Sequence, residues 1–339
     1  MTNRNSNLNN RPFLLKPAGK DYLWGGSRLN DDFSKGIELE PLAETWECST
    51  HPDGPSVVAS GPDTGKLLPQ VLSDHPEYIG SHPRELVKAE GELPILIKFI
   101  DARKDLSVQV HPDDAYARQM EHGSMGKSEM WYVLDASRDA RLVYGFRHDM
   151  DREVLKKSLL DGTVEKYLQK VKVRKDDVFY IEAGTVHALG AGALVAEIQE
   201  SSNLTYRMYD YNRVDKDGKK RQLHVEKALD VVRLQGSAQP RQPMRVLKYQ
   251  KGCASELLCR CRYFQTERLL LNTERCRQMA DFQTGHNTFQ VLLCTNGCGV
   301  LFEERGEFIN FFRGDCIFVP ADSVPLKIHG KAQLLRVSC

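Results

Sequence analysis

Residues 106–113 have the sequence Leu-Ser-Val-Gln-Val-His-Pro-Asp, which alternates apolar and polar side chains and stops at a proline. In a β-strand, alternate side chains point to the same face. Ser107, Gln109 and His111 therefore share one face, and the apolar residues occupy the other. A strand that presents a hydroxyl, an amide and an imidazole together predicts the floor of a polar pocket. An ordinary half-buried strand with no site is the alternative.

The composition limits the kind of protein. The chain has 339 residues, of which 41% are hydrophobic and 27% charged, which is typical of a soluble globular protein with one or two domains. The net charge of +1 does not point to a nucleic-acid or membrane partner. Residues 1–11 are Asn-rich and polar, so we expect a disordered lead-in and no signal peptide. No stretch approaches the roughly 20 apolar residues of a membrane span.

The nine cysteines are odd in number, and eight of them follow residue 250. Together with the lack of a signal peptide, this favours free thiols in a reducing cytoplasm. Cys259-x-Cys261 and Cys294-x-x-x-Cys298 are possible half-sites for zinc. They lack the paired CxxC spacing of a structural zinc site, so small buried hydrophobic residues are the favoured interpretation.

Periodicity and turn residues divide the rest of the chain. A buried strand at 94–100 contains Lys98, which indicates either a lysine beside a pocket or an edge strand with this side chain in water. Asp113 or Asp114 is expected to cap a helix that ends near Glu121. Strands are expected at 43–49, 127–134, 141–146 and 195–205, helices at 65–78, 149–169 (with a break at Gly162) and 223–234, and a linker at 236–242.

Two stretches of the chain resemble each other. Residues 177–187 and 315–325 share an acidic turn, four apolar strand residues, an alanine, a small polar residue and a valine. The strands upstream of them, 132–137 and 291–296, also align. This pattern predicts a duplicated β-barrel or jelly roll, with chance similarity of two short units as the alternative. His187 corresponds to Pro325 and Glu129 to Thr288, so a site in the first copy is lost in the second.

Four candidate ligands come from three predicted strands: Gln109, His111, Glu129 and His187. Two imidazoles and one carboxylate are the usual protein ligands of a catalytic Zn²⁺ or Fe²⁺ site, which keeps positions open for substrate. The alternative is that the imidazoles pack in a core and the carboxylate pairs with a nearby lysine. The remaining histidines show no partner pattern and are taken as structural: His51, His75, His82, His122, His148, His224, His286 and His329.

With these residues in place, the chain resembles a type I phosphomannose isomerase (mannose-6-phosphate isomerase) of the short bacterial kind, a member of the cupin superfamily. The resemblance covers residues 12–235 with specific motifs and the C-terminal third more loosely. The matching stretches are Trp24-Gly25-Gly26, Ala43-Glu44-Thr45-Trp46, His51-Pro52-Asp53-Gly54, Leu106 to Pro112, Lys127-Ser128-Glu129-Met130, Gly184-Thr185-Val186-His187-Ala188, Ser202 to Arg207, and Leu223 to Asp230.

The resemblance implies a mainly β fold with two cupin (jelly-roll) β-barrels and a small helical segment. We expect a catalytic domain at 12–235 with helical insertions, a linker at 236–245 and a metal-less cupin-like domain at 246–339. One Zn²⁺ per subunit would be held by Gln109, His111, Glu129 and His187. The implied reaction interconverts mannose 6-phosphate and fructose 6-phosphate through a cis-enediol, in a cytoplasmic monomer or homodimer.

The expected roles around the metal follow from side-chain chemistry. Arg207 corresponds to the active-site arginine of the family that this chain resembles. Its planar cation suits an enediolate or a phosphate. Lys127 is expected to shuttle protons. Ser107 is placed to bind a phosphate or hydroxyl, Trp24 to form an apolar wall, and Lys98 to bind substrate.

The chain departs from the longer members of this family at one position. They often have Asp four residues before the arginine, where this chain has Asn203, so Lys127 or Asp210 would have to act as the general base. The inserted helical domain of the longer members is absent as well. Two other functions remain open: an Fe²⁺-dependent oxygenase on the same ligand set, and a sugar-phosphate-binding regulator that keeps the ligands without the chemistry.

Overall fold

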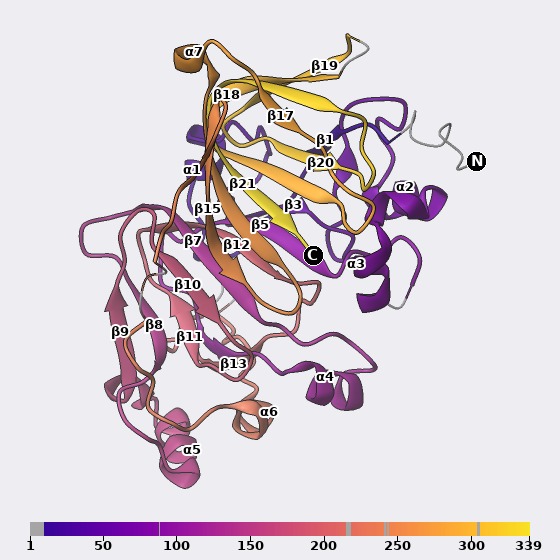
Figure 1. The fold of residues 1–339 in the computed structure, drawn as a ribbon. Coiled ribbons are helices and arrows are strands. Elements are labelled where there is room, and N and C mark those ends of the chain that lie inside the picture. Colours follow the sequence, from indigo (N-terminus) through magenta and orange to yellow (C-terminus); the bar gives the residue numbers. More distant parts are fainter. Residues whose placement is uncertain (1–9, 88, 215–217, 241, 243, 304–305) are drawn as a thin grey trace.

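The computed structural model describes residues 10–339 except 88, 215–217, 241, 243 and 304–305. Most of the predicted lead-in at 1–11 therefore lies outside the described residues. The protein is mainly β, as expected, and the described residues form three sheets that stack as layers (Figure 1). The two-barrel organisation and the domain boundaries stay predictions. No helix of the described part of the chain has the length and apolar character to cross a membrane.

The first layer is a ten-stranded sheet built mainly from the C-terminal third. Its order is β14 (Lys248–Gln250), β15 (Cys253–Arg260), β16 (Gln265–Asn272), β21 (Leu326–Ser338), β18 (Gln290–Glu303), β20 (Cys316–Val319), β1 (Phe13–Lys16) and β4 (Val57–Val58), with β17 (Ala280–Phe282) beside β21 and β19 (Phe308–Phe312) beside β18. Strand β1 pairs with β20, so the beginning of the described chain completes a sheet formed near its end.

The other two sheets come from the N-terminal two thirds. The six-stranded sheet has the order β10 (Val178–Ile181), β7 (Glu129–Ala136), β12 (Ala193–Glu200), β5 (Ile95–Asp101), β3 (Glu44–Cys48) and β2 (Ala18–Lys20). The five-stranded sheet has the order β13 (Tyr206–Tyr209), β6 (Val108–Val110), β11 (His187–Leu189), β8 (Arg141–Phe146) and β9 (Leu168–Lys172).

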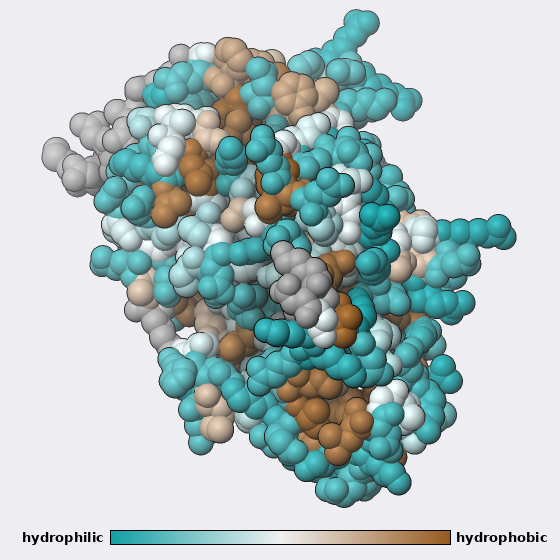
Figure 2. Space-filling view, turned by 180° about the vertical axis from the view of Figure 1, so that it is seen from behind, coloured by the Kyte–Doolittle hydropathy of each residue, from teal (hydrophilic) through white to brown (hydrophobic). Residues whose placement is uncertain are grey.

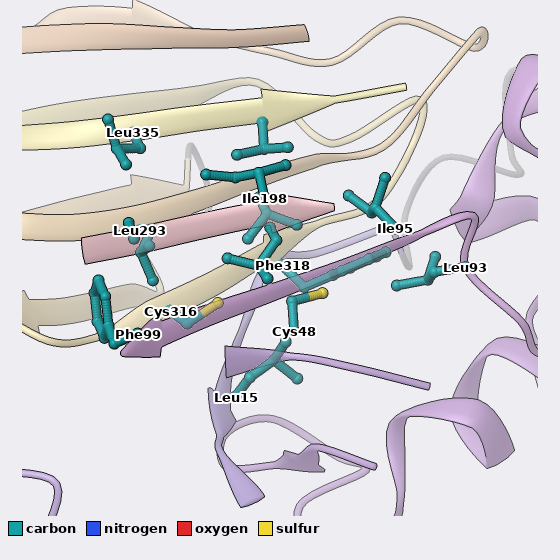
Figure 3. Packing of buried hydrophobic residues seen from close by; sticks show 14 of the residues in the cluster. Leu15, Cys48, Leu93, Ile95, Phe99, Ile198, Leu293, Cys316, Phe318 and Leu335 are labelled. Carbon is teal, nitrogen blue, oxygen red and sulfur yellow. The ribbon is translucent and has the colours of Figure 1, made fainter. Parts of the chain in front are cut away.

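The six-stranded sheet is the middle layer, which explains why every residue of β5 and β12 is buried. Ile95, Ile97 and Phe99 of β5 pack with Leu293, Phe318 and other residues of the ten-stranded sheet (Figure 3). Ile100, two positions from Lys98 on the same strand, packs on the opposite side, in a cluster with residues of the five-stranded sheet. Because side chains alternate along a strand, Lys98 also faces the five-stranded sheet. The prediction of a buried strand with a pocket-facing lysine is therefore confirmed over an edge strand in water, since Lys98 is only 3% exposed.

Helices cover the outside of these layers. They are α1 (Arg28–Asp31), α2 (Leu68–Asp74), α3 (Ser81–Leu86), α4 (Asp114–Met120), α5 (Arg152–Leu160), α6 (Val225–Val231) and α7 (Thr273–Cys276), with 3₁₀ turns η1 (Pro76–Ile79) and η2 (Val164–Lys166). Leu155 and Leu159 of α5 and Ala228 and Leu229 of α6 pack on the apolar side of the five-stranded sheet. The opposite face of that sheet is thereby left to the interior. The surface in Figure 2 is mostly hydrophilic, with its largest hydrophobic area near the lower end and smaller ones higher up.

Local predictions hold in part. Asp113 caps α4, its carboxylate accepting a hydrogen bond from the Tyr116 N–H, and the expected helices near 70, 155 and 228 are present. The stretch 149–169 is predicted to be helical with a break at Gly162. It forms α5 before this break and the 3₁₀ turn η2 after it, but it ends in the strand β9, whose Leu168 is buried against the five-stranded sheet. The strand predicted from residues 106–113 is shorter than expected: β6 begins only at Val108. All nine cysteines are free thiols, most of them buried.

Both repeated stretches form antiparallel pairs. Strand β10 pairs with β7, with Val178 opposite Tyr132, and β20 pairs with β18, with Cys316 opposite Leu293. The second pairing is displaced by two residues relative to the sequence alignment, which keeps the same side chains on the same face.

Candidate metal centre and substrate cavity

Two rows of side chains face each other across the gap between the middle sheet and the five-stranded sheet. Across the middle sheet, Lys98 is directly opposite both Trp46 and Glu197, and Glu197 is opposite Trp131. Across the five-stranded sheet, Gln109 is opposite both Arg207 and His187. Antiparallel register therefore brings residues from distant parts of the chain into one cavity.

The buried end of this cavity is formed by His111, Glu129 and His187, which are at most 1% exposed. Their ligand atoms lie within 4.8 Å of one another. The Nε2 atoms of the two histidines are 3.1 Å apart, and Glu129 lies 3.4 Å from His111 and 3.3 Å from His187. Two imidazole nitrogens and a carboxylate that converge on one point are the donor set of a divalent transition metal.

The hydrogen bonds around these side chains fit a metal. His187 Nδ1 lies 2.8 Å from the Thr185 carbonyl oxygen, so its proton is held there and the Nε2 lone pair points toward Glu129. Neither oxygen of Glu129 has a hydrogen bond from the described residues, although Lys127 Nζ is 3.0 Å from Oε2. A fully buried carboxylate that one ammonium group contacts at one oxygen only is costly unless a further cation completes it.

The charge states also favour a cation. Burial lowers the pKa of His111 to about 3, so this imidazole is neutral and able to donate a lone pair. Burial also lowers the pKa of His187. Burial opposes ionisation of Glu129, but Lys127 and the two imidazoles hold its pKa well below the usual range. The cluster therefore presents two neutral nitrogens and one anion.

Gln109 is adjacent to this cluster. Its side-chain amide lies 3.3 Å from His187 Nε2, with the amide nitrogen as the nearer atom. Rotating the amide by 180° exchanges its two ends and places the oxygen there, which is the atom that binds metals. Lys127 lies on the other side, with Nζ 3.2 Å from His111 Nε2.

The cavity above the cluster has a volume of about 270 Å³. Six of the residues predicted from the sequence line it, namely Ser107, Trp24, Lys98, Gln109, Lys127 and Arg207. The other three predicted residues are the buried cluster beneath. The structure therefore brings all of the predicted site residues into one place.

Sequence reasoning assigned no site role to three charged residues of the cavity wall: Glu44, Glu197 and Arg221. Glu197 is 3% exposed, lies 3.3 Å from Lys98 Nζ and accepts a hydrogen bond from the Trp131 indole. The sequence did indicate such a residue, because a buried lysine such as Lys98 needs a carboxylate partner. Arg221 also lines the cavity, and its guanidinium is held by the Asp210 carboxylate at 2.8 Å. No local pattern marks this residue.

The cationic side of the cavity, formed by Arg207 and Arg221, is held in place by residues outside the cavity. Asp210 accepts hydrogen bonds from Arg213 and Arg221, and these charges keep its pKa below the usual range despite burial. Arg207 donates to the Gln222 carbonyl oxygen at 2.9 Å, while burial and the neighbouring Arg221 lower its pKa. Asp210 is occupied by two guanidiniums and is not among the cavity-lining residues. This leaves it poorly suited to act as a base.

Comparison with known proteins gives one consistent result. Residues 13–138 match the family model of the phosphomannose isomerase type I catalytic domain. The chain is 33% identical over 333 residues to the mannose-6-phosphate isomerase ManA of Bacillus subtilis, covering 97% of this chain and 99% of that protein. The crystal structure of a mannose 6-phosphate isomerase from B. subtilis superposes with a TM-score of 0.86 at 32% identity, covering 97% and 99% of the two chains. A zinc-bound mannose 6-phosphate isomerase structure shares the fold, with a TM-score of 0.73 at 17% identity and coverage of 96% and 98%.

Proposed function

The chain belongs to the mannose-6-phosphate isomerase family, and we propose that it interconverts mannose 6-phosphate and fructose 6-phosphate at the cavity described above. The observation that carries the proposal is the buried cluster of His111, Glu129 and His187 at the end of a cavity with several cationic side chains. A phosphorylated hexose has both features that such a cavity recognises: hydroxyl oxygens at one end and a dianion at the other.

We propose that Zn²⁺ is the metal and that His111, Glu129, His187 and the oxygen of Gln109 hold it. This choice is supported by the donor set and by the zinc in the related structure that shares the fold. When bound, the ion supplies positive charge that stabilises an enediolate formed from the sugar's carbonyl and neighbouring hydroxyl.

The chain's own residues would supply the rest of the chemistry. The reaction moves one proton between C1 and C2 of the open-chain sugar and another between the oxygens on these two carbons. Lys127 is the proposed proton carrier, because its ammonium nitrogen lines the cavity within 3.2 Å of the proposed ligands. Glu197 is a second proton-handling candidate, since burial and the charge of Glu129 raise its pKa.

The phosphate is proposed to bind at the cationic side. Arg207 and Arg221 line the same cavity as Ser107, so two guanidiniums and a hydroxyl are available to the phosphate. The indole of Trp24, 4% exposed, borders the cavity as an apolar wall. Lys98 is engaged by Glu44 and Glu197, so its expected contribution is to position these carboxylates as well as to attract the substrate.

The test is a coupled assay on purified protein. Formation of fructose 6-phosphate should require mannose 6-phosphate, stop when a chelator removes the metal and return with Zn²⁺. His187→Ala should lower kcat at least a thousandfold, whereas His329→Ala, a change in the C-terminal sheet, should leave it unchanged. Full activity of a metal-free protein would refute the proposed site. Metal analysis that found iron together with oxygen uptake would favour an oxygenase instead.

A cytoplasmic location and a monomeric or homodimeric state also stay predictions.

A further inference from the structure

The segment that carries Lys127 and Glu129 is held by three consecutive backbone N–H groups. Gly126 N–H donates to Asp114 Oδ1 at 3.0 Å, Lys127 N–H to the Pro112 carbonyl oxygen at 3.0 Å, and Ser128 N–H to a Glu200 carboxylate oxygen at 2.7 Å. The three acceptors come from two segments that frame the site. Pro112 and Asp114 follow His111, and Glu200 ends β12.

Pro112 and Asp114 both join the two ligand-bearing segments, and Asp114 does so through its side chain. It is the first residue of α4, three positions after His111, while Gly126 is the residue before Lys127. The two segments approach so closely that a Cβ on Gly126 would lie 2.5 Å from the Asp114 nitrogen. The carboxylate of Asp114, together with the Pro112 carbonyl oxygen, therefore sets the distance between the segments that carry His111 and Lys127.

The second oxygen of Asp114 is held from the C-terminal sheet. Tyr263 donates its hydroxyl hydrogen to Asp114 Oδ2 at 3.1 Å, and Arg118 donates to the same oxygen at 2.9 Å. Tyr263 lies in the connection between β15 and β16. This connection is closed by a hydrogen bond from Cys261 N–H to the Phe264 carbonyl oxygen, and Phe264 is anchored in the core at 2% exposure. Tyr263 is thus presented from a rigid turn.

We propose that Tyr263 is a positioning residue for Lys127, and that the C-terminal sheet contributes to the reaction through the chain Tyr263–Asp114–Gly126. This inference rests on the proposed function. Tyr263 touches neither the cavity nor the proposed ligands. It acts by fixing Asp114, which fixes the backbone N–H next to Lys127. Glu129 is farther from this contact, because the Ser128 N–H that precedes it bonds to Glu200 and not to Asp114. The effect should therefore fall on proton transfer more than on metal binding.

The test compares Tyr263→Phe, Asp114→Asn and the double variant. Tyr263→Phe removes one hydroxyl and keeps the ring, so we expect kcat to fall about fivefold to tenfold, with KM and bound zinc within twofold of wild type. The double variant should be no slower than Asp114→Asn. In a Lys127→Ala background, Tyr263→Phe should have no further effect. The control is Tyr249→Phe, at a tyrosine of β14 that is 80% exposed.

Three kinetic results would overturn the inference. The first is a kcat of Tyr263→Phe within twofold of wild type. The second is a double variant in which the falls in kcat of the two single variants multiply. The third is a fall in kcat on Tyr263→Phe that persists in the Lys127→Ala background. A variant that loses thermal stability but keeps its kcat per folded molecule would show a merely structural role and also refute it. If the wild-type protein lacked isomerase activity, the proposed function would fail first. An active wild type with an unaffected Tyr263→Phe variant refutes this inference alone.

Discussion

Replacing Lys98 with methionine is expected to destabilise the protein through the carboxylates it leaves behind. Lys98 Nζ lies 3.3 Å from Glu197 and 3.6 Å from Glu44, and the exposed fractions of these three side chains are 4%, 4% and 10%. At an effective dielectric constant of about 20, each contact corresponds to a gross attraction of about 5 kcal/mol. The cost of desolvating the lysine offsets much of this attraction.

The net change in the free energy of unfolding depends on the two carboxylates that the substitution leaves in place. Methionine fills a similar volume, but Glu44 and Glu197 stay buried without their cation. Removing one partner of a buried ion pair usually costs about 3–5 kcal/mol, and we expect the free energy of unfolding at pH 7 to fall by that amount. Burial already raises the pKa of Glu197. Loss of Lys98 should raise that pKa further, so the penalty should shrink as the pH falls and this carboxyl takes up a proton.

The measurement is denaturant unfolding of the metal-free protein, so that metal binding does not add to the stability. Lys156→Met is the matched control, because its pair with Glu226 has exposed fractions of 38% and 70%. An exposed pair contributes at most about 1 kcal/mol. Lys98→Met/Glu197→Gln should recover part of the loss. If Lys98→Met destabilised the protein no more than the control does, the proposal that Glu44 and Glu197 depend on the charge of Lys98 would be refuted.

Two further predictions concern other groups. Burial raises the pKa of Glu200 to about 8. Between the ordinary carboxyl pKa near 4.5 and pH 8 the unfolded chain therefore binds fewer protons than the folded one, and stability falls as pH rises, by about 1.4 kcal/mol per pH unit. Glu200→Gln should remove this slope in unfolding measured from pH 5 to 8, and an unchanged slope would refute the assignment. Arg221→Ala should raise KM for mannose 6-phosphate about tenfold or more with a smaller change in kcat, measured by steady-state kinetics; an unchanged KM would exclude Arg221 from the phosphate site.

Much of the site could be predicted from the sequence because its residues follow strand periodicity. The alternation at 106–111 places Gln109 and His111 on one face, and the comparison of the two repeated stretches singles out Glu129 and His187. These four side chains come together because two antiparallel sheets face each other. The same logic placed Lys98 beside a pocket, since a buried lysine in an apolar strand needs a partner.

Other parts depend on contacts that no local pattern reveals. Strand β1 pairs with β20 across about 300 residues, and nothing in the sequence of either strand specifies the other. Arg221 reaches the cavity through its tether to Asp210, which is a tertiary contact. The connection from Tyr263 to Asp114 likewise joins residues 149 positions apart. Long-range pairing is set by packing and register, which the chain specifies only as a whole.

The burial of the middle sheet on both faces has a consequence for synthesis of the protein. Strands β3, β5, β7, β10 and β12 leave the ribosome before β16, β18, β20 and β21, which cover one of their faces. The side of the nascent chain that faces the metal cluster can form early, while Ile95, Ile97 and Phe99 stay exposed to solvent. A ribosome that stalls before β16 would therefore present an apolar sheet to chaperones, although all of the proposed metal ligands have already been made.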